Sequence, residues 1–136
     1  MGLLSNTSST VPLASFHPQR PLAMRLWKMF VESVDPCTKI MHIPTTEVRV
    51  YTVLQDPSKA SSENLGVCFA IYYASATALD PDVVEAILGE QRQTALHRYK
   101  AGLEQALAET DFLENPTIPL LQALAVYLVG ANNTIT

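Results

Sequence analysis

Apolar residues recur along this chain at the spacing of an α-helix. Over residues 19–34 they occupy every fourth position, namely Leu22, Leu26, Phe30 and Val34. A second stripe over residues 90–113 consists of Leu96, Tyr99, Leu103, Ala106 and Leu107. Side chains at such spacings share one face of a helix. Because no stretch alternates between apolar and polar residues as a half-buried strand does, the pattern predicts an all-α fold.

Two stretches carry no charged residue at all, residues 67–78 and 118–129. A helix that is apolar on nearly every side is typical of the interior of a protein body, and both stretches are shorter than the roughly 20 residues that span a bilayer. We therefore expect no membrane span. We expect instead that both helices are covered by neighbours, in a dimer or by a protein partner. In the first stretch, Ala70, Ala74 and Ala78 offer a face that another helix can approach closely.

Turn and capping residues divide the chain into about six helices, which we expect to pack as antiparallel pairs. They cover about residues 19–34, 45–55, 62–79, 80–88, 90–113 and 117–130. The clearest boundaries are Asp80 as an N-cap before Pro81, and Gly89 as a C-terminal stop. Residues 1–17, rich in Ser and Thr, are expected to form a disordered lead-in. We expect residues 18–130 to form the helical body and residues 131–136 to form a tail.

The charge content is low and its balance is acidic. Charged residues make up 16% of the chain, against about 25% in ordinary globular domains, and the formal net charge is −4. An acidic chain has no general attraction for phosphate backbones. We therefore expect no direct nucleic-acid binding by this chain, and the low charge again favours association with a protein partner or with itself.

The sequence shows no constellation of catalytic or metal-binding residues. The three histidines are far apart, and two cysteines, Cys37 and Cys68, match neither a zinc motif nor a disulfide framework. A Cys37–His42 dyad in one loop is the best catalytic alternative, but no third group orients it. We expect no enzyme activity and no cofactor. The residues that we assign to a pocket or an interface are Trp27, His42, Tyr72, Tyr73 and Tyr127.

An ordered series of short segments resembles a known family. These segments are residues 26–36, 38–45, 69–74, 88–90, 99–108, 111–113 and 120–124. In order and spacing they are similar to the opening of the fungal-specific transcription factor domain, the middle homology region of zinc binuclear cluster regulators. The resemblance covers about residues 17–130, the early part of that larger helical domain.

This resemblance implies a helical regulatory and protein-interaction segment of a transcription factor, located in the nucleus, although a cytoplasmic location stays open. It also implies that zinc and DNA contacts belong to a six-cysteine cluster, which this chain does not contain, and that a small-molecule effector can bind. One alternative is a small helical metabolite-binding protein or enzyme with an apolar pocket between the uncharged helices. Another is an incomplete gene model without independent function.

Overall fold

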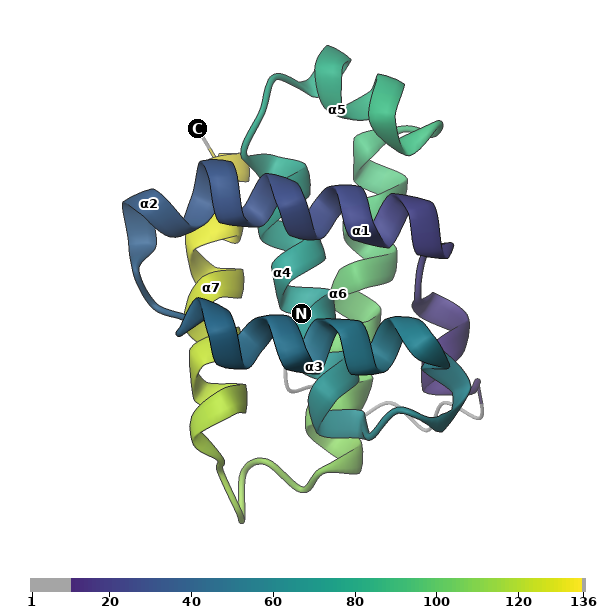
Figure 1. Cartoon of the computed structure of the whole chain (residues 1–136), viewed down its shortest axis with the longest axis vertical. Coiled ribbons are helices and arrows are strands. Elements are labelled where there is room, and N and C mark those ends of the chain that lie inside the picture. Colours follow the sequence, from purple (N-terminus) through teal and green to yellow (C-terminus); the bar gives the residue numbers. More distant parts are fainter. Residues whose placement is uncertain (1–10, 136) are drawn as a thin grey trace.

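The structure is a computed structural model that describes residues 11–135, and it is helical throughout this part of the chain, without a strand (Figure 1). The α-helices are α1 (Arg20–Met29), α2 (Asp35–Thr38), α3 (Ile43–Gln55), α4 (Ser62–Thr77), α5 (Pro81–Leu88), α6 (Arg92–Glu109) and α7 (Ile118–Ile135). Short 3-10 helices occupy Leu13–Phe16 and Pro57–Lys59, and a π-helix, Phe30–Val34, joins α1 to α2. The predicted all-α class is confirmed.

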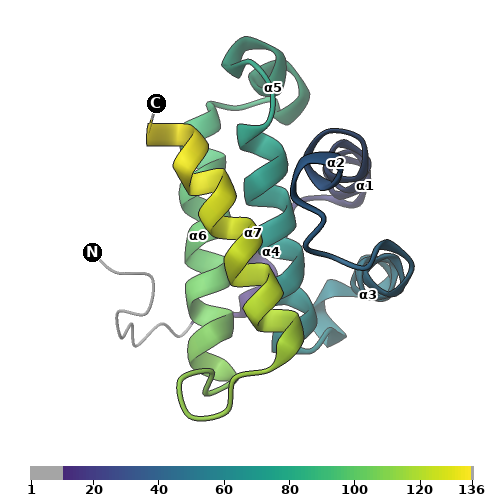
Figure 2. The same cartoon turned by 90° about the vertical axis from the view of Figure 1, so that its left-hand side faces the viewer.

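The helices form two layers that cross each other. Helices α4, α6 and α7 make one layer, and α1 with α2 and α3 lie across one side of α4, as Figure 2 shows from the side. Antiparallel pairing holds for α1 with α3 and for α4 with α6. Helix α7, however, packs along α4 and runs in the same direction, rather than pairing with its chain neighbour α6 (Figure 1).

Helix α4 is the centre of the core, as its uncharged sequence predicts. Every residue from Leu65 to Thr77 is buried, and the helix packs against α1, α3, α6 and α7. The expectation that residues 67–78 need cover from outside the chain is therefore wrong, because the crossing layers provide that cover within one molecule.

Small residues set how closely the helices of the core approach one another. A Cβ atom built on Gly102 of α6 would lie 2.7 Å from the ring of Phe69, and one on Gly130 of α7 would lie 3.0 Å from the Cα of Ala74 in α4. Such distances leave no room for a side chain. The sequence predicted that this helix ends at about residue 130. Gly130 instead lies inside α7, at the point where α7 meets α4.

The first helical segment continues past the proline that was expected to stop it. In a regular helix, the ring of Pro36 would collide with the carbonyl of Glu32. The preceding turn is widened into the π-helix Phe30–Val34, and Pro36 lies in the first turn of α2. Likewise, α3 begins at Ile43 rather than at Thr45 or Thr46, because Pro44 is well tolerated in a first turn.

One further expectation differs from the structure. Residues 11–17 belong to the predicted disordered lead-in, yet Leu13 is buried and His17 is partly buried against the core; residues 1–10 lie outside the described residues. In α5, Val84 and Leu88 are buried, whereas Val83 is 50% exposed. The N-cap Asp80 and the left-handed Gly89 are confirmed.

Candidate functional site

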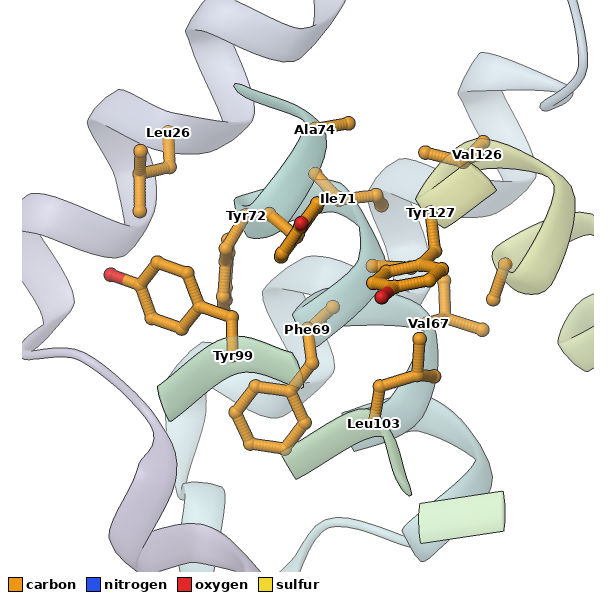
Figure 3. Close-up of a cluster of buried hydrophobic side chains, with 14 of the residues drawn as sticks. Leu26, Val67, Phe69, Ile71, Tyr72, Ala74, Tyr99, Leu103, Val126 and Tyr127 are labelled. Atoms are coloured by element: carbon orange, nitrogen blue, oxygen red, sulfur yellow. The ribbon is translucent and has the colours of Figure 1, made fainter. Parts of the chain in front are cut away.

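Four of the five candidate residues are buried in the core, and Trp27 and Tyr72 lie deepest. Trp27 is buried and stacks on Phe30, with ring centroids 5.9 Å apart. Tyr72 is fully buried among the rings of Phe69 and Tyr99, which surround it in Figure 3. Neither side chain is at an exposed surface, so both stabilise the fold rather than line an open pocket.

Tyr73 and Tyr127 form a pair between α4 and α7. Their ring centroids are 4.7 Å apart, and each residue is 7% exposed. Burial raises the pKa of Tyr127 to about 12, with smaller contributions from Tyr73 and Glu104. This pair belongs to the contact between the two uncharged helices, and Figure 3 shows Tyr127 at that contact beside Val126.

His42 alone among the five lines a groove at the surface. The α3–α7 groove, about 300 Å³, is lined by Met41, His42, Thr45, Thr46, Arg49, Val67, Ile118, Pro119 and Gln122. His42 is exposed, and its Nδ1 is hydrogen-bonded to Thr45 Oγ1 at 2.8 Å. The backbone carbonyl of His42 accepts a hydrogen bond from the buried hydroxyl of Thr46. The five candidates thus do not come together in one site.

The sequence did not single out His17, which connects the N-terminal segment to the core. Its Nε2 lies 2.7 Å from the hydroxyl of Tyr72, and burial lowers its pKa, opposed by a backbone hydrogen bond to Pro18. Burial also raises the pKa of Tyr72, and it raises that of the neighbouring Cys68 to about 12. This contact joins residues 55 positions apart, so no local sequence pattern could have indicated it.

A second and larger groove, the α1–α6 groove, opens beside His17. It has a volume of about 530 Å³ and is lined by Ser15, His17, Pro18, Gln19, Pro21, Leu22, Arg25, Ile87, Leu88, Glu90 and Arg98. Both terminal nitrogens of Arg98 donate to the carboxylate of Glu90 at 2.8 Å. This bidentate pair lowers the pKa of Glu90 and leaves each charge largely neutralised by the other.

The outer face of α7 is an apolar surface on the outside of the molecule. Ile118, Leu121 and Leu128 are 71%, 50% and 56% exposed. With the half-buried Ala125 they follow the alternating three- and four-residue spacing of a helix that packs against another helix. Residues 118–133 contain no charged side chain. This surface, which we call the outer α7 face, was predicted from the uncharged sequence and is confirmed.

The structure offers no support for the catalytic or metal alternatives. Cys37 and His42, the suggested dyad, line different grooves. Within residues 11–135, no three His, Cys, Asp or Glu side chains gather as metal ligands would. Cys37 is exposed and Cys68 is buried, and neither forms a disulfide. Among the same residues, no helix has the length and apolarity needed to cross a bilayer.

Comparison with known proteins shows similarity to fungal transcription regulators. The chain is 29% identical over 137 residues to the aurofusarin cluster transcription factor aurR2 of Gibberella zeae, and this match covers 93% of the chain. It is 33% identical over 107 residues, 78% of the chain, to the pyriculol/pyriculariol biosynthesis cluster transcription factor 1 of Pyricularia oryzae. It is 30% identical over 134 residues, 96% of the chain, to the C6 finger domain transcription factor nscR of Trichophyton rubrum.

The matched region is a small part of each relative. The chain spans 20% of the length of the aurofusarin regulator, 14% of the pyriculol regulator and 19% of nscR. No family model and no solved structure matches the chain. Over most of its length, the chain is homologous to one segment of fungal transcription regulators.

Proposed function

We propose that the chain is a helical regulatory and protein-interaction segment of a fungal zinc-cluster-type transcription factor, equivalent to the early part of the fungal-specific transcription factor domain. The similarity to nscR, a C6 finger protein, over 96% of the chain supports this proposal. In such a factor, a separate zinc-cluster region outside the matched segment binds DNA. The same reasoning gives the segment a nuclear location and no catalytic role.

The observation that carries the proposal is the outer α7 face. Helix α4 is buried from Leu65 to Thr77, and the inner side of α7 is buried at Leu120, Ala123, Val126 and Tyr127. On the outer side of α7, Ile118, Leu121 and Leu128 remain at least half exposed. A row of large apolar side chains on one helix, without a charge among them, is typical of a surface that another helix covers.

The size of this face favours an occupant from the same polypeptide. Full burial of one such side chain is worth about 1.5–3 kcal/mol, so the exposed fractions of the three leave roughly 3–5 kcal/mol unrealised. If a separate partner buried an equally large apolar surface of its own, the summed gain would do little more than offset the free-energy cost of association, about 4–15 kcal/mol. A helix of the same regulator pays less, because its effective concentration is high. We therefore propose that another segment of the regulator covers the outer α7 face.

A chimeric regulator tests this function. The matched segment of the aurofusarin relative is replaced by this chain, and transcription is measured from a promoter which that relative regulates. We expect the chimera to support transcription, and the double variant Leu121→Glu, Leu128→Glu to abolish it. Val48→Glu on α3, where Val48 is 67% exposed, is the matched control and should have no effect. An inactive chimera with the unaltered chain, or an active double variant, would contradict the proposal.

A further inference from the structure

We propose that the α3–α7 groove binds a small amphipathic organic anion, with its anionic group at Arg49 and its apolar body along the groove wall. This inference goes beyond the proposed function. The groove shares Ile118 with the outer α7 face but uses neither Leu121 nor Leu128. It rests on three features of the groove: an apolar wall, a guanidinium with unused donors, and the starts of two helices.

The groove has the size and the lining of a ligand site. Its volume of about 300 Å³ is at the lower end of the range for small-molecule pockets, about 300–1,000 Å³. The buried side chains of Met41 and Val67, together with Ile118 and Pro119, supply apolar surface. These residues come from the loop before α3, from α4 and from the first turn of α7, so the wall belongs to the tertiary fold.

Arg49 supplies a guanidinium that the fold holds in place, and Glu63 balances part of its charge through an ion pair at 3.3 Å. Its Nη1 donates to Asn64 Oδ1 at 2.6 Å and to Glu63 Oε2 at 3.3 Å. The N–H groups of Nη2 and Nε have no hydrogen-bond partner among the described residues. Its side chain is 27% exposed, so the guanidinium is anchored on one edge and still open to a ligand on the other. An anchored guanidinium loses little further freedom when it binds a carboxylate.

The two helices beside the groove both present their N-terminal ends to it. Each begins with an Ile-Pro pair, Ile43-Pro44 in α3 and Ile118-Pro119 in α7, and neither has an acidic residue in its first turn. No side chain caps α3, and the hydroxyl of Thr117 before α7 has no hydrogen-bond partner. The first N–H groups and the positive ends of both helix dipoles therefore add to the attraction for an anion.

The two grooves differ in how many donors of their arginine are already occupied. Arg49 uses only Nη1, on Glu63 and Asn64, and Glu63 is not among the residues that line the α3–α7 groove. Arg98 has both terminal nitrogens occupied by Glu90, and that carboxylate itself lines the α1–α6 groove. The smaller groove is thus the better match for an anionic ligand, although the larger one holds the second arginine, Arg25. The fixed amide of Gln122, whose Nε2 donates to Ile40 O, adds a carbonyl acceptor for a ligand hydroxyl.

The test is a pair of probes with the same shape and different charge. ¹⁵N-labelled chain is titrated at neutral pH with 4-phenylbutyrate and, separately, with 4-phenyl-1-butanol, and backbone amide shifts are followed by NMR. We expect the acid to shift amides of residues 42–50 and 117–122 and to bind at least tenfold more tightly than the alcohol. Arg49→Gln should weaken binding of the acid about tenfold, whereas Arg25→Gln should leave it unchanged.

Arg49→Gln also removes the contacts of Arg49 with Glu63 and Asn64 in α4, which could change the fold. A second variant therefore blocks the groove without changing these contacts. Thr45 is exposed at the rim of the groove, so Thr45→Trp should block binding while the fold and the thermal midpoint are kept. Three results would overturn the proposal: equal affinity for 4-phenylbutyrate and 4-phenyl-1-butanol, amide shifts confined to residues of the α1–α6 groove, or unchanged binding of the acid by Arg49→Gln and Thr45→Trp. Leu128→Glu should bind the acid normally, so failure of this proposal is distinguishable from failure of the proposed function.

Discussion

Replacing Gly102 with alanine tests the packing of α6 against α4 at its closest point. A Cβ atom at this position would lie 2.7 Å from two atoms of the Phe69 ring, whereas favourable carbon contacts are about 3.5–4.0 Å. The ring cannot move away easily, because Phe69 is fully buried and in edge contact with Phe16 and Tyr72. The substitution therefore forces an overlap of nearly 1 Å into a filled core.

Two effects of opposite sign decide the result. Alanine in place of glycine inside a helix gains about 1 kcal/mol of helix propensity, while overpacking costs typically about 1–3 kcal/mol. Because the contact with the buried Phe69 ring would be as short as 2.7 Å, we expect the cost to lie in the upper part of this range. Gly102→Ala should then lower the free energy of unfolding by about 1–2 kcal/mol, and the thermal midpoint by about 4–8 °C for a chain of this size. Urea unfolding followed by circular dichroism measures the difference.

A double-mutant cycle with Phe69→Leu identifies the cause. Leucine removes the ring atoms that Gly102 approaches, so Gly102→Ala should cost less in the Phe69→Leu background than in the parent chain. If Gly102→Ala is as stable as the parent, or more stable, then helix propensity outweighs the overlap. That result would refute the close approach of α6 and α4.

Three further predictions concern single groups. Burial lowers the pKa of His17 in the folded chain below its ordinary value of 6.5, so the unfolded chain binds more protons as the pH falls through 6.5, and stability should decrease between pH 7.5 and pH 5. His17→Gln should remove part of this loss in urea unfolding, and the exposed control His97→Gln should not. The side chain of Asp80 accepts a hydrogen bond from the backbone N–H of Asp82, so Asp80→Ala should cost about 0.5–2 kcal/mol in the same assay, and no change would contradict the cap. With a thiol reagent at pH 8, Cys37 should react rapidly in the folded chain, and Cys68, whose pKa is raised to about 12, only after unfolding; two fast thiols would contradict its burial.

Local signals in the sequence predicted several elements well. The uncharged run over residues 67–78 correctly indicated the central helix, because a helix without a polar face is stable only when it is surrounded. Asp80, Pro81 and Gly89 correctly marked the ends of α5, because capping depends on residues within one helical turn.

Other features depend on residues far apart in the chain. Gly130 resembled a helix stop, but its small size serves the contact with Ala74 in α4. His17 belonged to a polar stretch without periodicity, and only the fold brings it to Tyr72. The π-helix before Pro36 could be predicted only if it were known that the chain stays helical beyond the proline. For these positions, tertiary packing outweighs the local preference.

The candidate site was predicted in part. The uncharged run over residues 118–129 indicated an apolar surface, and the outer α7 face confirms it. Arg49, Gln122 and the two helix starts of the α3–α7 groove were missed, because each is ordinary in its own segment and the fold alone places them beside His42. Aromatic residues such as Trp27 and Tyr72 were assigned to a pocket or interface, whereas their size favours the core.

The central claim is that the core of the chain is complete without a partner and that the outer α7 face remains exposed to solvent. The most direct test measures both properties. Size-exclusion chromatography with light scattering and binding of a hydrophobic dye are measured for the chain and for Leu121→Glu, Leu128→Glu. We predict a monomer at micromolar concentration that binds the dye, and a double variant that loses dye binding while its thermal midpoint stays the same. A double variant that unfolds, or that binds the dye as the parent does, would contradict the account.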